Sequence, residues 1–205
     1  SIVDEDSDIA EALEKIHNRN LCIVAYTGSF IKWQGVNFIA ENFDYICDKV
    51  KNIFFVFLGD GREFEYVKNK IESGKYSSNA LIHHGVEKKK IRKIMEYIDI
   101  VLIPREKNLT TNTAVPLKAI EAMQMGKCIL SSDDDGLTEL LNHDNARIFK
   151  ACNIESLTEK LNELSEDKEL RNLLGNQARM DAEKVLHSWN DNVIMLREKY
   201  KEILR

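Results

Sequence analysis

The sequence is poor in the residues that break regular structure or cross-link a chain. Its 205 residues include two prolines, nine glycines and four cysteines. So few breakers leave little room for a flexible linker between elements. The four cysteines lie far apart and without metal-ligand spacing; they are Cys22, Cys47, Cys128 and Cys152. We interpret them as free thiols in a reducing compartment, which favours a cytoplasmic location.

Long apolar runs and an excess of basic charge are also missing. No stretch approaches the roughly 20 apolar residues that span a bilayer, and no signal peptide opens the chain, so we expect no transmembrane segment. The net charge of −5 gives no electrostatic case for binding nucleic acid. The one basic cluster, between Lys88 and Lys93, is typical of a solvated helix face.

What the sequence does contain is a regular alternation of strand and helix patterns. Continuous apolar runs predict buried strands near residues 21–26, 53–58, 80–84, 98–103, 128–131 and 146–149. Stretches with helical spacing separate them, and the chain is helical in pattern from Ile154 onward. This order predicts an α/β fold: a single Rossmann-like domain over residues 21–205, with a parallel sheet of about six strands, helices on both faces and a helical C-terminal tail. We expect residues 1–20 to form a linker or connecting helix.

The most informative stretch is the helix between the fourth and fifth strands. It begins near Pro116, ends before Gly126 and is apolar almost all round, which predicts burial between two layers. Its first two turns nevertheless carry Lys118 and Glu121. One interpretation is a surface ion pair. The other places both at a helix N-terminus beyond the strand ends, where a phosphate and sugar hydroxyls can bind. The residues alone leave both open.

A resemblance favours the second interpretation. The sequence P-L-K-A-I-E-A-M-Q-M-G-K-C-I-L-S-S-D from Pro116 resembles the signature helix of the retaining GT-B glycosyltransferases of family 4. In that family two glutamates stand eight residues apart, and both belong to the catalytic site. The resemblance implies that Glu121 holds the donor ribose. Thr113 stands where the first glutamate, a ligand of the donor sugar, is expected.

Two loops extend the resemblance. Y-T-G-S-F-I-K-W-Q-G-V resembles the family's glycine loop at the donor diphosphate, which implies donor contacts from Gly28, Ser29, Lys32, Gln34 and Gly35. Ser29 and Gln34 stand where the family often has Arg and Lys, and Lys32 or Lys118 could supply a compensating charge. A plain tight turn is the alternative for this loop. The sequence H-H-G-V-E implies that Gly85 and Val86 bracket the nucleobase, and the signature helix implies that amides of Ala114 and Val115 hold the diphosphate.

The resemblance also implies partners and excludes others. We expect a UDP- or GDP-sugar as donor, no cofactor, and no metal, although Asp133–Asp135 would otherwise suggest one. The chain matches only the C-terminal, donor-binding half of a GT-B enzyme. We therefore expect a glycan or lipid-linked acceptor to bind a missing N-terminal domain, which could also attach the protein peripherally to the inner membrane face. This half alone should be inactive.

Two alternatives stay open. The first is a non-catalytic nucleotide-sugar binding module, favoured by the changes at Ser29, Gln34 and Thr113. The second is a nucleotide-sugar epimerase on the same architecture, for which Glu139 and His84 are the weak candidate residues.

Overall fold

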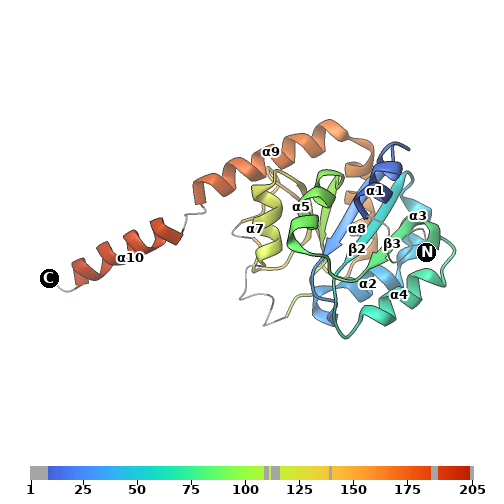
Figure 1. The fold of residues 1–205 in the computed structure, drawn as a ribbon, viewed down its shortest axis with the longest axis horizontal. Coiled ribbons are helices and arrows are strands. Elements are labelled where there is room, and N and C mark those ends of the chain that lie inside the picture. Colours follow the sequence, from blue (N-terminus) through green and yellow to red (C-terminus); the bar gives the residue numbers. More distant parts are fainter. Residues whose placement is uncertain (1–8, 109–110, 112–115, 139, 186–188, 204–205) are drawn as a thin grey trace.

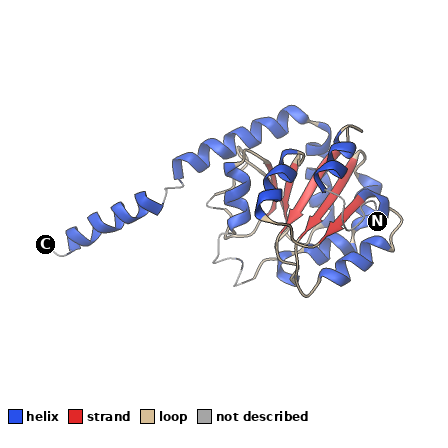
Figure 2. Cartoon of the chain, viewed as in Figure 1, coloured by secondary structure: helices blue, strands red, loops and turns tan. Residues whose placement is uncertain are grey.

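Six parallel strands form the centre of the structure, a computed structural model that describes residues 9–108, 111, 116–138, 140–185 and 189–203. The strands form one sheet at the centre of the domain (Figure 2). Their order is β3-β2-β1-β4-β5-β6. The strands are β1 (Cys22–Thr27), β2 (Ile53–Leu58), β3 (Ala80–His83), β4 (Ile100–Ile103), β5 (Cys128–Ser132) and β6 (Arg147–Phe149). The expected parallel α/β sheet of a Rossmann-like domain is confirmed.

The strand order reverses direction at β1. This strand pairs with β2 from Cys22 to Thr27 and, on its other edge, with β4 through Val24 and Ala25. The chain thus builds β1 to β3 outward on one side and β4 to β6 outward on the other. In open parallel sheets, ligands bind beyond the carboxyl ends of the strands at such a switch point. The loops that follow β1 and β4 are therefore the first place to look for a site.

Helices cover both faces of the sheet (Figure 1). One apolar cluster packs α2 (Val36–Glu41), α3 (Phe43–Lys49), α4 (Phe64–Glu72) and α8 (Ile154–Glu166) on the sheet. The other packs α1 (Ile9–His17), α5 (Lys88–Glu96), α7 (Leu117–Gln124) and most of the buried residues of α9 (Lys168–Val185). Successive strand residues alternate between the clusters, as in Val24 and Ala25, because a strand points neighbouring side chains to opposite faces.

Short helices and a terminal helix complete the described chain. Two 3₁₀ turns, η1 (Lys32–Gln34) and η2 (Ser77–Asn79), precede α2 and β3. The last helix, α10 (Trp189–Ile203), extends away from the sheet beyond α9 (Figure 1). No helix among the described residues is long and apolar enough to cross a membrane.

One expectation about the helices needs correction. The helix after the fourth strand, α7, is not buried all round: Ala119, Ala122 and Met123 are buried, but Leu117 is 74% exposed and Met125 42%. The reason is that α7 packs on β5 and α9 with one side only. In the segment expected as a connecting helix, α1 buries Leu13 and Ile16 in the second cluster, so this helix is part of the domain core.

Candidate functional site

Three loops converge at the carboxyl ends of the central strands, and glycines make this possible. Gly35 has a φ of +75°, and a Cβ built there would lie 1.6 Å from the carbonyl oxygen of Pro104. Gly59, with a φ of +152°, would bring a Cβ to 1.7 Å from the carbonyl oxygen of Gly28. Side chains at these positions would collide with backbone, which only glycine avoids. The loops after β1, β2 and β4 are therefore in direct backbone contact.

Lys118 enters this junction from the first turn of α7. Its Nζ donates a hydrogen bond to Gln34 Oε1 at 2.7 Å and lies 4.5 Å from the ring centroid of Tyr26. A Cβ built on Gly28 would lie 3.4 Å from the same Nζ, so the amine sits against the glycine loop. The ion pair with Glu121 that the spacing allowed is not formed within the described chain. Glu121 is exposed, one turn further along α7.

Burial, and second the nearby Arg105 guanidinium, together lower the pKa of the Lys118 amine to about 7. Arg105 follows β4 and is 2% exposed. Its Nη1 lies 2.9 Å from Oδ2 of the fully buried Asp134, and its Nη2 donates to the carbonyl oxygen of Thr111 at 3.2 Å. Two basic groups, the Lys118 amine and the Arg105 guanidinium, thus lie close together at this edge, and Asp134 pairs with the guanidinium. Such a balance suits an anionic ligand.

Sequence reasoning missed the pairing of Arg105 with Asp134. Each is the second residue after a buried strand, β4 or β5, and a charged residue in that position was the available signal. The guanidinium also lies 5.8 Å from the ring of Trp33 in the glycine loop. Arg105 therefore ties the loop after β4 to its two neighbours.

A second set of contacts fixes the loop after β3. Asp60 accepts a hydrogen bond from the Gly85 amide at 2.8 Å, and its other oxygen is bonded to His84 Nδ1. The bond from His84 holds the pKa of Asp60 below its usual value. The His84 ring also stacks on Phe64, with 4.0 Å between ring centroids. These contacts set the position of Gly85 and of Val86, which is partly buried.

The remaining candidates divide into three groups. Ser29 and Lys32 are exposed on the glycine loop, and the Ser29 carbonyl accepts a hydrogen bond from Tyr26 Oη at 2.6 Å. Asp133 and Asp135 lie 3.2 and 3.6 Å from Lys107 Nζ, so they form ion pairs there. The described residues contain no group of three His, Cys, Asp or Glu placed to hold a metal. Thr113, Ala114, Val115 and Glu139 lie outside the described residues.

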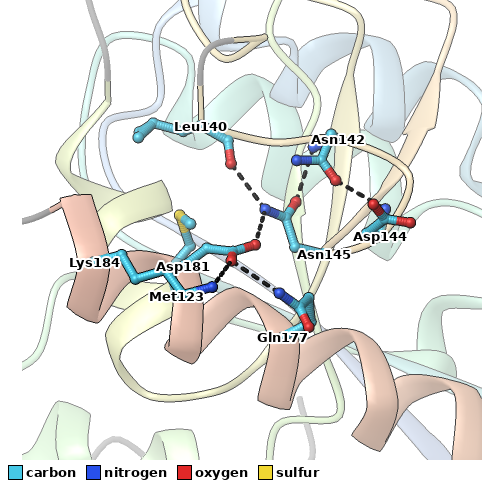
Figure 3. Close-up of a pocket in the computed structure, with 8 residues that line it drawn as sticks. All are labelled: Met123, Leu140, Asn142, Asp144, Asn145, Gln177, Asp181 and Lys184. Atoms are coloured by element: carbon cyan, nitrogen blue, oxygen red, sulfur yellow. Dashed lines mark hydrogen bonds and ion pairs between the residues drawn. The ribbon is translucent and has the colours of Figure 1, made fainter.

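A separate pocket of about 290 Å³ lies between α9 and the turn that precedes β6 (Figure 3). Asn145 is 1% exposed, and its Nδ2 donates to the Leu140 carbonyl and to Asp181 Oδ2, both at 3.0 Å. Its Oδ1 accepts from the Asn142 amide at 2.8 Å. All its hydrogen-bonding groups are used in joining this turn to α9, which indicates a structural role.

Comparison with known proteins identifies the family of this chain. Residues 8–181 match the family described as glycosyl transferases group 1. The chain belongs to this family. The six-stranded parallel sheet matches one Rossmann-like half of the GT-B glycosyltransferase fold.

Two curated glycosyltransferases resemble the chain. It is 24% identical over 181 residues to an uncharacterised glycosyltransferase of Methanocaldococcus jannaschii, covering 87% of this chain and 47% of that protein. It is 27% identical over 165 residues to the N,N'-diacetylbacillosaminyl-diphospho-undecaprenol alpha-1,3-N-acetylgalactosaminyltransferase of Campylobacter jejuni, covering 80% and 40%. The chain thus spans less than half the length of either relative.

A solved structure confirms the fold. The Anabaena protein HepE, crystallised with UDP and glucose, superposes with a TM-score of 0.73 at 18% identity, covering 98% of this chain and 53% of that one. At this identity the likeness establishes the architecture alone.

Proposed function

We propose that this chain is the donor-binding half of a retaining glycosyltransferase and that it binds a nucleoside diphosphate sugar at the carboxyl ends of β1 and β4. The observation that carries the proposal is the Lys118 amine, held against Gly28 at the switch point of the sheet. A lysine there can form charge-assisted hydrogen bonds to a diphosphate. It supplies the charge that Ser29 and Gln34 do not.

Each loop then has a part in holding the donor. Glu121 would bind the ribose hydroxyls, and the backbone at Gly85 and Val86 would contact the base. Amides of Ala114 and Val115 would bind the diphosphate together with Lys118. Stabilising the negative charge that develops on the leaving diphosphate lowers the barrier to sugar transfer. Charge stabilisation by Lys118 and the amides would need no metal or cofactor.

Two similar proteins support a choice of donor and acceptor. HepE was crystallised with UDP, which favours UDP over GDP as the nucleotide. The Campylobacter relative is named for a lipid-linked diphosphate acceptor. We propose a UDP-sugar donor and a glycan or lipid-linked acceptor that binds a second domain, with transfer in the cytoplasm.

The alternatives are less well supported. Ser29 and Gln34 lack the positive charges that the family often has at these positions, which favours a non-catalytic binding module. However, the Lys118 amine lies at the same loop and can carry such a charge. An epimerase would need His84 as an acid or base, whereas the His84 ring is bonded to Asp60 and stacked on Phe64. Product analysis with one UDP-sugar and no acceptor would reveal an epimerase by a changed sugar.

The first prediction concerns Glu121. Isothermal titration of the chain with UDP, GDP and their sugar conjugates should show binding of a UDP compound. Glu121→Ala should weaken that binding roughly tenfold to a hundredfold, because hydrogen bonds to a carboxylate are lost. EDTA should leave the affinity unchanged.

Glu72→Ala is the matched control, since Glu72 is exposed at the far end of α4. Equal affinities of Glu121→Ala and the unmodified chain would remove Glu121 from the site. Failure of every nucleotide to bind would contradict the proposed donor site in this chain.

A further inference from the structure

Lys118 is part of α7, but its amine contacts residues of the glycine loop. Gln34, at the end of η1, is 8% exposed and directs its Oε1 to Lys118 Nζ at 2.7 Å. A glutamine carbonyl oxygen can only accept a hydrogen bond. Gln34 therefore accepts a hydrogen bond from an amine that lies 84 residues further along the chain.

Two more groups confine the amine. The Tyr26 ring is fully buried, and its centroid lies 4.5 Å from Lys118 Nζ, within the range of a cation–π contact. The Tyr26 hydroxyl donates to the Ser29 carbonyl at 2.6 Å, which ties the ring to the loop. Gly28 leaves the third side open to Nζ because it has no side chain. An amide oxygen, an aromatic face and bare backbone thus set the position of one flexible side chain.

We propose that Gln34 and Tyr26 are positioning residues that hold the Lys118 ammonium against the glycine loop for an anionic ligand. The inference rests on the proposed function and adds that Gln34 and Lys118 act as one exchangeable pair. A pre-set lysine loses less side-chain freedom on binding, which improves affinity. A second cation at position 34 would lie beside the Lys118 amine, which already has Arg105 nearby, so like charges would repel one another there.

The test is an exchange of the two residues. Titration with UDP compares the unmodified chain with Gln34→Lys, Lys118→Gln and the double variant that carries both changes. Each single change should weaken UDP binding at least about tenfold, since one brings two ammonium groups together and the other removes the only member of the pair that is charged. The double variant keeps the net charge and the lysine–glutamine contact, so it should recover most of the affinity. A purely structural role of Gln34 would give no such recovery.

Matched controls carry the same charge changes elsewhere. Gln124→Lys lies at the exposed end of α7 and Lys168→Gln at the exposed start of α9. Both should bind UDP as the unmodified chain does. Gln34→Met, which keeps the side-chain length without the acceptor, replaces Gln34→Lys if that variant does not fold; it should also bind UDP at least about tenfold more weakly.

A readout without ligand separates this inference from the donor site. Acetic anhydride labelling across a pH series, followed by mass spectrometry, measures when the Lys118 amine becomes reactive. Gln34→Met and Tyr26→Leu should each shift that profile, whereas Gln124→Lys should not. Binding of UDP by the unmodified chain without recovery in the double variant would overturn the positioning role. An unchanged labelling profile would overturn it even if UDP does not bind.

Discussion

At the scale of single residues, the chemistry of the site depends on the protein groups around the Lys118 amine, which affect its charge. The groups in contact with its amine are Gln34 and Tyr26 from the first half of the chain, and the charge of Arg105 also acts on it. Burial disfavours the charged amine, and Arg105 disfavours it further. An anionic ligand would reverse this balance and favour the ammonium.

This gives a prediction for pH. The folded, unliganded pKa of Lys118 is about 7, while an unfolded lysine has a pKa near 10.4. Above pH 7 the unliganded amine is mostly neutral, so binding a diphosphate should take up close to one proton at pH 8. Titrations with UDP in buffers of different ionisation enthalpy measure this uptake. Lys118→Gln should abolish it, and equal uptake in that variant would assign the proton to another group.

The lowered pKa of Lys118 also determines whether its contribution to the free energy of unfolding rises or falls with pH. Between pH 7 and about 10 the unfolded lysine holds a proton that the folded one has lost. The unfolded state therefore binds more protons, and the contribution of Lys118 to the free energy of unfolding rises with pH across this window.

At the scale of elements, the site depends on backbone contact between loops that are distant in sequence. The glycine loop touches the loop after β4 at Gly35 and the loop after β2 at Gly59. Ser132 Oγ, at the end of β5, donates to the Arg105 carbonyl at 2.7 Å and extends this contact to the next strand. The edge of the sheet is thus one connected surface.

Two glycine substitutions test that contact. Gly35→Ala should lower the free energy of unfolding by about 3 kcal/mol or more, because a left-handed φ and a backbone collision act together. Gly126→Ala has the left-handed φ of +65° but no contact closer than 3.6 Å, and should cost only about 1–2 kcal/mol. Urea denaturation measures both. Equal losses of unfolding free energy in the two variants would mean that the backbone at Pro104 can move to accommodate the added methyl group.

At the scale of the whole molecule, the two core clusters divide the helices between the faces of the sheet. The second cluster includes α1, which precedes the first strand and packs on α5. The domain core therefore begins within the first 20 residues. The match to the glycosyl transferases group 1 family also begins there, at residue 8.

Leu13 tests whether α1 is part of the core. Leu13 is fully buried, so Leu13→Ala should cost about 2–5 kcal/mol of unfolding free energy in urea denaturation. Leu173→Ala, on the exposed side of α9, should change it by less than about 0.5 kcal/mol. A loss below about 1 kcal/mol at Leu13 would show that α1 contributes little to the fold.

Local sequence pattern was enough to predict the six strands, the helices between them and the parallel sheet. Runs such as Cys22–Thr27 and Ile53–Leu58 are apolar at every position because both faces of their strands are covered. The pattern also indicated the loops that carry the candidate site, since strand ends can be read from the residues that follow them. These features depend on neighbours within about ten residues.

Only the tertiary structure decided which groups meet in the site. Spacing offered Glu121 as the partner of Lys118, yet the amine turns to Gln34, which no local pattern could indicate. Packing also buried Arg105 with Asp134 and left Leu117 of α7 exposed. The physical reason is that hydrogen bonds and ion pairs form between whichever groups the folded sheet brings within about 3 Å. That proximity is set by strand order and helix packing across the whole chain.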